Sequence, residues 1–299
     1  MSSLRLITCG AALGIAFSAI AGCDKGDQAP PVASVSLTTN RPSVALGAPV
    51  ELTYKFEPAA GVSIPGDYRV FVHINRDDGT TIWNDDHELP ADQQTSQWKP
   101  GQTIQYTRTR FVPAFSYLGA ATIRVGLYKD NERLPLSGQD PADRVSPERS
   151  YKVGTLEFLP RSESIQVIRL SGWHPGEFAQ DGSAVEWQWS QKLALISLKN
   201  PHRDVLLYLE YDGRPDLFTD QPQQVTVSVG QTAIETFPVE EKGILLRKIP
   251  LTVAQLGNGD MTEVRLEVDR TFAPAKLAGG SRDSRELGIR VYHAFVEPR

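Results

Sequence analysis

The sequence is poor in cysteine, in clustered positive charge and in long apolar runs. Its 299 residues include two cysteines and two methionines, and its formal net charge is -5. Two cysteines cannot form a disulfide framework or a four-thiolate zinc site. The mild acidity, without clusters of Lys and Arg, excludes the electrostatic footprint of a nucleic-acid-binding protein. We therefore expect no nucleic-acid partner.

The motifs of common catalytic sites are also missing. The chain has no G-x-S-x-G elbow, H-E-x-x-H pair, P-loop or Rossmann glycine pattern. A glycosidase pair of carboxylates has no fixed spacing in sequence, because the fold brings its members together, so this class stays open. The missing motifs favour a protein that is not an enzyme and that needs no cofactor.

One apolar run, near the N-terminus, has the length of a signal peptide and is too short to cross a bilayer. Arg5 precedes the uncharged run 6–21, and small residues follow at its end. The stretch Ile20-Ala21-Gly22-Cys23 resembles the lipobox of bacterial lipoproteins. The resemblance implies cleavage between Gly22 and Cys23, diacylglycerol on the Cys23 thiol, and acylation (palmitate) of the new amino group. The alternative is an ordinary secreted protein with a chance cysteine near its cleavage site.

The lipobox also implies a location and a layout. Residues 1–22 are the signal peptide, and residues 23–33 form a polar, proline-containing tether with nothing to pack against. Several acyl chains make membrane attachment effectively permanent. We expect the globular part outside the cytoplasm, in the bacterial cell envelope, anchored to the inner or the outer membrane.

Beyond the tether, apolar residues recur with a period of two. Segments 50–56, 121–127, 225–229 and 264–268 alternate apolar and polar residues, as half-buried antiparallel strands do. Segment 205–209 is apolar on both faces and predicts a central strand. Helical periodicity is confined to one turn near residues 252–256. We expect an all-β chain of two antiparallel β-sandwich domains, 34–160 and 161–299.

Two sets of motifs resemble known β-sandwich modules. A W-x-P-G turn at 98–101, then V-P at 112–113, G-L-Y at 126–128 and R-L-P-L at 133–136 resemble Ig-like modules of bacterial envelope proteins, some of them appended to membrane glycosyltransferases. The D-x-R-x-L-G-I stretch at 283–289 is similar to the closing strand of jelly-roll modules in bacterial polysaccharide-related proteins. The resemblances imply an Ig-like domain followed by a jelly-roll-like domain, and no catalytic residues.

A hairpin in the first domain brings together three candidate metal ligands. If Asp78-Gly79 is a two-residue turn with positive φ at both positions, His73 pairs with Asn84 and lies diagonal to Asp86, with His87 close by. Such a group suits Zn²⁺ or a similar ion. We favour a His–Asp hydrogen bond that closes the hairpin, because a catalytic metal normally needs three protein ligands and Asp85 would point to the opposite face.

The second domain offers candidate ligand-binding residues. Trp173 and His174 lie in a turn-like G-W-H-P stretch, which makes Trp173 the better candidate for an exposed sugar-stacking ring. Trp187 and Trp189 share one strand face, and we favour packing in the core for both, because Glu186 and Gln188 are polar. Arg282 and Arg285 either form ion pairs within their loop or contact an acidic glycan or a partner.

The leading hypothesis is a membrane-anchored envelope lipoprotein without catalytic activity that binds glycan or protein partners at the cell surface or in the periplasm. One alternative is an assembly scaffold that recruits a partner protein through its sheet edges and loops. The other is a metal-dependent hydrolase that uses His73, Asp86 and His87.

Overall fold

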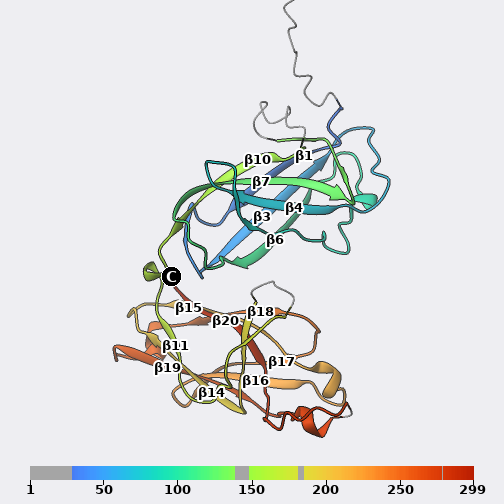
Figure 1. Cartoon of the computed structure of the whole chain (residues 1–299). Helices are drawn as coiled ribbons and strands as arrows, with labels where there is room; N and C mark the ends of the chain where they lie inside the picture. Colours follow the sequence, from blue (N-terminus) through green and yellow to red (C-terminus); the bar gives the residue numbers. More distant parts are fainter. Residues whose placement is uncertain (1–28, 139–147, 181–184, 278) are drawn as a thin grey trace, which may run out of the picture.

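The computed structural model describes residues 29–138, 148–180, 185–277 and 279–299. The predicted signal peptide, the lipobox with Gly22 and Cys23, and most of the tether lie outside these residues. Within the described ranges almost every element is a strand, which confirms the predicted all-β sandwich fold. No helix in these ranges has the length and apolar character needed to span a bilayer. Two pairs of sheets follow one another along the chain (Figure 1).

The first sandwich comprises β1 to β10. One sheet has the order β6-β3-β1-β9 and the other β2-β10-β7-β4-β5, with β8 on β7. The edge pairs β1–β9 and β2–β10 are parallel, whereas the remaining described pairs of this sandwich are antiparallel. Its strands are β1 (Ala33–Thr39), β2 (Ser43–Ala45), β3 (Pro49–Pro58), β4 (Arg69–Asn75), β5 (Thr81–Asn84), β6 (Ile104–Phe111), β7 (Gly119–Lys129), β8 (Glu132–Arg133), β9 (Leu136–Ser137) and β10 (Tyr151–Leu159).

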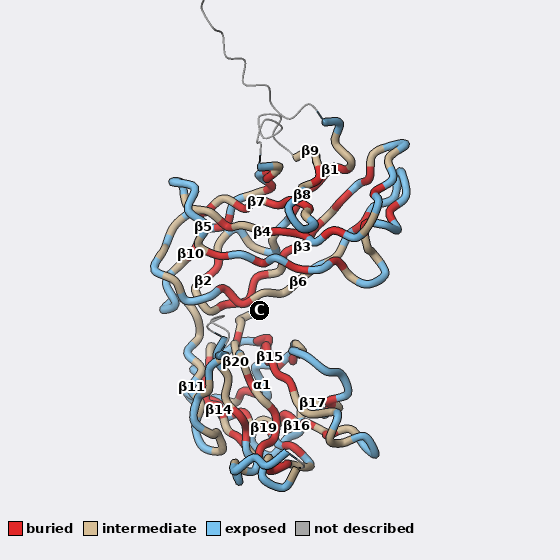
Figure 2. The backbone as a smooth tube through the Cα atoms, turned by 45° about the vertical axis from the view of Figure 1, so that its right-hand side comes forward, coloured by how far each residue is buried: buried red, intermediate tan, exposed pale blue. Residues whose placement is uncertain are grey.

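The core of the first sandwich follows the predicted alternation. In β3, Leu52, Tyr54 and Phe56 point inward and are fully buried, while the polar residues between them are half-buried or exposed. The inward face of β7 packs against them from the other sheet. Figure 2 shows buried segments alternating with exposed ones along the strands of both sandwiches. Burial of this apolar surface is the main force that holds the two sheets together.

The hairpin between β4 and β5 differs from the two-residue turn predicted at Asp78-Gly79. The Gly79 N–H bonds to the Arg76 carbonyl at 2.9 Å, the Arg76 N–H bonds to the Thr80 carbonyl at 3.0 Å, and only Gly79 in this turn has a positive φ, +82°. This is a three-residue loop with a bulge at the glycine. A second irregularity beside Ile74 compensates for the shift, so His73 pairs with Asn84 as predicted.

The second sandwich has the strand order of a jelly roll. Its eight main strands pair as β13–β20, β14–β19, β15–β18 and β16–β17, like one long hairpin folded over on itself. The sheets run β11-β14-β19-β16-β17 and β12-β13-β20-β15-β18. The strands are β11 (Val167–Arg169), β12 (Glu177–Phe178), β13 (Glu186–Trp189), β14 (Leu193–Lys199), β15 (Val205–Asp212), β16 (Gln223–Val229), β17 (Thr232–Val239), β18 (Leu245–Leu251), β19 (Met261–Val268) and β20 (Arg290–Pro298).

Within the described residues, the one α-helical turn falls where the sequence predicts it. Helix α1 (Val253–Leu256) begins after Thr252, whose hydroxyl accepts the Gln255 N–H while the Gln255 side chain accepts the Thr252 N–H. This reciprocal capping box satisfies two backbone donors that a helix start would otherwise leave unpaired. Gly257, with φ +75°, follows the last helical residue.

Strand β15 is apolar on both faces because each face is covered. One face, with Leu207 and Leu209, belongs to the core of the second sandwich. The other face carries Leu206 and Tyr208, which pack against Phe111 at the end of β6 in the first sandwich. The predicted central strand is therefore confirmed, and its outer face forms the junction between the two sandwiches.

Polar contacts surround this apolar junction. The His293 ring stacks on Phe111, with the ring centroids 4.3 Å apart and the planes 5° from parallel. Lys248 pairs with Glu51, and Arg41 pairs with Glu297. Each of these contacts joins one sandwich to the other.

Candidate functional site

The structure separates the three predicted metal ligands between two faces of one sheet. His73 lies on the outer face of β4, with its Nε2 atom 3.9 Å from Oδ1 of Asp86. His87 is turned to the interior, where its Nδ1 atom lies 2.5 Å from the carbonyl oxygen of Asp85. Residues two apart in extended chain share a face, so Asp85 and His87 point one way and Asp86 points the other. Within the described residues no group of three His, Cys, Asp or Glu side chains is placed to hold a metal ion.

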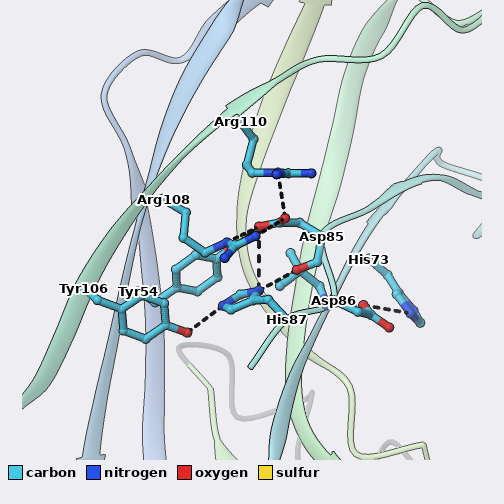
Figure 3. A network of polar contacts seen from close by, with 9 residues as sticks. Tyr54, His73, Asp85, Asp86, His87, Tyr106, Arg108 and Arg110 are labelled. Carbon is cyan, nitrogen blue, oxygen red and sulfur yellow. Dashed lines mark hydrogen bonds and ion pairs between the residues drawn. The ribbon is translucent and has the colours of Figure 1, made fainter. Parts of the chain in front are cut away.

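Asp85 is the centre of a buried polar network between β3, β6 and the segment that follows β5 (Figure 3). Its carboxylate accepts hydrogen bonds from the Tyr54 hydroxyl at 3.1 Å and from Nε and Nη2 of Arg108, each at 3.0 Å. Nε of Arg110 lies 2.8 Å from the same carboxylate. His87 joins the network through the Tyr106 hydroxyl, 2.8 Å from its Nε2 atom. The two sheets of the first sandwich are thus linked by charge as well as by apolar packing.

Burial shifts the titration of the neutral members of this network. Desolvation lowers the pKa of the His87 imidazole, which keeps the ring uncharged at neutral pH. Desolvation, followed by the nearby Asp85 charge, raises the pKa of the Tyr54 phenol well above its ordinary value. Burial likewise raises the pKa of Tyr106. These three side chains, held in their neutral forms, surround the Asp85 carboxyl group and its two guanidinium partners.

In the second sandwich, Trp173 is a packing residue. It is half-buried against the core, its indole N–H donates to the Leu195 carbonyl at 2.8 Å, and the Arg169 guanidinium lies 5.1 Å above its ring. With its ring face covered and its donor used, Trp173 offers no open stacking surface. His174, next in the chain, has its Nε2 atom 2.8 Å from the Glu286 carbonyl.

Trp187 and Trp189 lie on the face of their sheet that points away from the main core of the sandwich. The predicted packing is confirmed for Trp189, which is buried in a smaller hydrophobic cluster, whereas Trp187 is half-buried. Gln188, between them, pairs with the core residue Val291, and its side-chain oxygen accepts a hydrogen bond from Arg169 at 2.6 Å. The two tryptophans instead pack with Phe272 in a separate apolar cluster under the chain's own loops. Gln188 can face inward because Arg169 supplies a hydrogen bond to its side-chain amide.

Arg290 holds the aromatic side chains of this outer face together. Its guanidinium lies 5.2 Å from the Trp187 ring centroid, 5.3 Å from that of Trp189 and 5.6 Å from that of Tyr292. It also donates from Nε to the buried carboxylate of Asp212 at 2.7 Å, and the Tyr292 hydroxyl donates to Asp212 at 3.0 Å. Burial, followed by the Asp212 charge, raises the pKa of the Tyr292 phenol. Cation–π contacts and a paired charge therefore fix the orientation of Trp187.

A row of paired charges continues from Trp187 toward the 283–288 segment. Glu177 accepts the Trp187 indole N–H at 3.2 Å and pairs with Nη2 of Arg285 at 2.8 Å. Arg285 also donates from Nη2 to Asp283 at 2.8 Å, and this bonding lowers the pKa of Asp283 to about 2. We call Glu177, Trp187, Asp212, Asp283, Arg285, Arg290 and Tyr292 the Trp187 cluster. It contains predicted Arg285, whereas predicted Arg282 lies exposed outside it.

A shallow hollow opens beside this cluster. It has a volume of about 480 Å³ and is lined by His174, Gln191, Lys192, Leu193 and Glu286. The structure therefore brings two of the predicted ligand-binding residues, His174 and Arg285, to the same end of the second sandwich.

Sequence reasoning missed the residues that organise both sites. Asp85, Arg108 and Arg110 were not predicted as a group, although Tyr106, Arg108 and Arg110 alternate in register with the buried Ile104. Polar residues on a core-facing period signal a buried network, because each needs an internal partner. Arg290 and Asp212 left no such signal, since the loops that cover them come from distant parts of the sequence.

Comparisons with known proteins identify no family for this chain. No protein-family model matches the sequence, and no curated protein is similar to it. A β-glucuronidase of Bacteroides uniformis is 12% identical, with a TM-score of 0.27, over 86% of this chain and 28% of that one. The CBM51-2 and INT domains of Clostridium perfringens ZmpB, in complex with GlcNAc, are 10% identical, with a TM-score of 0.24, over 60% of this chain and 38% of that one. The chain thus spans less than two fifths of the length of either structure.

Proposed function

We propose that this protein is a membrane-anchored lipoprotein of the bacterial envelope that binds glycan through the second sandwich and has no catalytic role. The Trp187 cluster carries the glycan part of the proposal. It combines a half-buried indole with charged donors and acceptors whose geometry is already set by their own pairing. Sugar rings present apolar C–H faces and hydroxyl groups that both donate and accept, which is what such a surface complements.

The charge of the cluster favours a neutral sugar. The carboxylates of Glu177, Asp283 and Asp212 face the two guanidinium groups of Arg285 and Arg290, which leaves a formal charge of -1. An acidic sugar would be repelled, whereas a neutral one would meet both donors and acceptors. We therefore propose a neutral glycan in place of the acidic glycan considered from the sequence.

Binding of residues 24–299, the chain without the signal peptide and without Cys23, to a panel of neutral oligosaccharides and matched uronic-acid oligosaccharides tests the proposal. We expect signals on neutral members and at least a roughly 10-fold loss of affinity in Arg285→Gln, because charged hydrogen bonds would be removed. Arg76→Gln is the matched control, since Arg76 forms a similar pair with an aspartate two residues away, in the first sandwich. Silence across the whole panel would remove glycan binding from the proposal.

The lipid anchor has its own test. A globomycin-sensitive shift in gel mobility, absent in Cys23→Ala, is expected if the thiol of Cys23 carries diacylglycerol. An unchanged mobility in both cases would favour the secreted alternative, in which Cys23 is incidental.

A second candidate, the recruitment of a partner protein, is favoured by apolar side chains at the outer strands of the second sandwich. Leu170 and Ile168 lie in or next to edge strand β11 with exposures of 47% and 39%, and Phe178 in edge strand β12 is 62% exposed. Cross-linking in intact membranes should give one defined adduct that Leu170→Ser weakens. Unaltered cross-linking in this variant would leave the β11 edge without a role.

A further inference from the structure

We propose that Arg108 and Arg110 form a binding site for an oxyanion (a carboxylate, sulfate or phosphate group) at the open edge of the first sandwich. The site is separate from the Trp187 cluster and does not depend on glycan binding. It lies where edge strand β6 faces the segment after edge strand β5 (Figure 3).

Both guanidinium groups contact one buried carboxylate and are themselves partly exposed. Both pair with Asp85, whose side chain is 1% exposed, while the side chains of Arg108 and Arg110 are 29% and 40% exposed. Side chains two apart in a strand point the same way, so the two arginines lie on the same face of β6, and each is partly exposed there. A shared buried carboxylate therefore holds two cations side by side at the surface.

The donors of Arg110 are largely unused. Its Nε atom faces Asp85, and within the described part of the chain Asp85 is its one ionic partner. Arg108 uses Nε and Nη2 on the same carboxylate and leaves Nη1. The planar fork of a guanidinium matches two oxygens of a carboxylate, sulfate or phosphate. The remaining N–H groups are of the kind that recognises an oxyanion.

The charge balance has the sign such a ligand requires. Two guanidinium groups face one carboxylate, which leaves a formal charge of +1, the opposite of the surplus at the Trp187 cluster. His87 contacts the Tyr106 hydroxyl through Nε2 and the Asp85 carbonyl oxygen through Nδ1, and neither His87 nor Tyr106 supplies a competing negative charge. Asp85 already restricts both arginine side chains. Binding of an anion therefore costs little additional conformational entropy.

Titration of residues 24–299 with sodium sulfate, phosphate or acetate, at ionic strength held constant with chloride, tests the site. We expect saturable shifts of the Arg108 and Arg110 guanidinium signals in NMR spectra. Arg110→Gln should weaken binding roughly 10-fold or more, because it removes a charged donor. In Arg110→Gln the ion pair between Arg108 and Asp85 remains, so we expect the fold to persist. Arg110→Lys keeps the positive charge but loses the planar fork of the guanidinium. Its affinity for the anion should therefore lie between those of the wild type and Arg110→Gln.

Arg76→Gln is the control, since it removes one positive charge from an exposed pair elsewhere in the same sandwich. Trp187→Ala should leave anion binding unchanged and so separates this site from the proposed glycan site. Stronger binding of sulfate and phosphate than of acetate would assign a tetrahedral ligand, and the reverse a carboxylate. Shifts that do not saturate, or that Arg76→Gln reduces as much as Arg110→Gln, would overturn the proposal.

Discussion

At the residue scale, the buried carboxylate of Asp85 holds the polar network of the first sandwich together, so its loss should cost stability. Asp85→Asn keeps an acceptor for Tyr54 but leaves Arg108 and Arg110 facing a neutral amide. Removing one partner of a buried ion pair leaves the other charge uncompensated. We expect the free energy of unfolding, measured in urea, to fall by about 3 kcal/mol.

Asp78→Asn is the matched control for this change. Asp78 is exposed and pairs with Arg76, and an asparagine there keeps an acceptor for the Thr80 N–H. Such surface pairs contribute less than about 1 kcal/mol. Equal destabilisation by the two substitutions would contradict a special role for the buried charge.

The buried imidazole of His87 predicts a loss of stability in acid. Desolvation lowers its pKa in the folded state below the ordinary value of 6.5, so the unfolded chain binds the proton more readily. The folded state therefore loses stability as the pH falls below that ordinary value, by up to about 1.4 kcal/mol per pH unit for one proton. Urea unfolding between pH 7.5 and 5 should show a steeper decline in the wild type than in His87→Gln. Parallel curves would assign the acid sensitivity to other groups.

At the element scale, one glycine in β7 leaves the space that the Phe71 ring of β4 occupies. Gly126 in β7 pairs with Phe71 in β4, and a Cβ atom at this position would lie 2.3 Å from the Phe71 ring and 2.7 Å from the Arg149 carbonyl oxygen. The Arg133 guanidinium, 4.5 Å from the ring centroid, contacts the ring as well. Gly126→Ala should lower the free energy of unfolding by about 1–3 kcal/mol through overpacking.

Gly154→Ala provides the comparison for Gly126. Gly154 lies in β10, on the other side of β7, and a Cβ atom there would meet nothing within 4 Å. Thermal unfolding of this variant should match the wild type closely. A similar loss in both variants would mean that glycine flexibility, and not the contact with Phe71, sets the cost.

Strands were predictable from the sequence where one face meets the core and the other meets water. The alternation in β3, β7, β16 and β19 reflects this difference directly. The short edge strands β2, β8, β9 and β12 have two or three residues each and carry no period to detect. The turn at Gly79 also differs from its prediction, because a dipeptide does not reveal whether a neighbouring bulge will shift the register.

The site residues were harder to predict because their faces were misjudged. From polarity alone, Gln188 is expected on the outer face of the sheet and Trp187 on the core face. The structure has the opposite arrangement, because Arg169 bonds the Gln188 side chain and loop residues such as Phe272 cover the tryptophan face. His73 and Asp86 lie near each other as predicted. His87, the residue after Asp86, points to the opposite face of the sheet, because successive residues of an extended chain face opposite ways. Local sequence determines which residues share a face; long-range packing determines whether that face is covered.

At the scale of the whole molecule, the junction between the sandwiches decides whether they behave as one body. A small apolar patch of Phe111, Leu206, Tyr208, Leu246 and Phe295 lies at its centre. Phe295 also packs against the core of the first sandwich, and the ion pairs Lys248–Glu51 and Arg41–Glu297 flank the patch. Contacts of this kind couple the unfolding of one sandwich to that of the other.

Phe111→Ala should uncouple the two sandwiches. The ring contacts Tyr208 edge-on and stacks on His293, so its loss removes on the order of 3 kcal/mol of packing at the junction. Calorimetry should show a single transition in the wild type and two resolved transitions in the variant, with faster proteolysis in the connecting segment 160–166. Phe115→Ala is the control, because Phe115 packs against Phe158 inside the first sandwich and should destabilise that sandwich without freeing the connection. An unchanged calorimetric profile would show that the remaining apolar residues and the ion pairs hold the junction without the Phe111 ring.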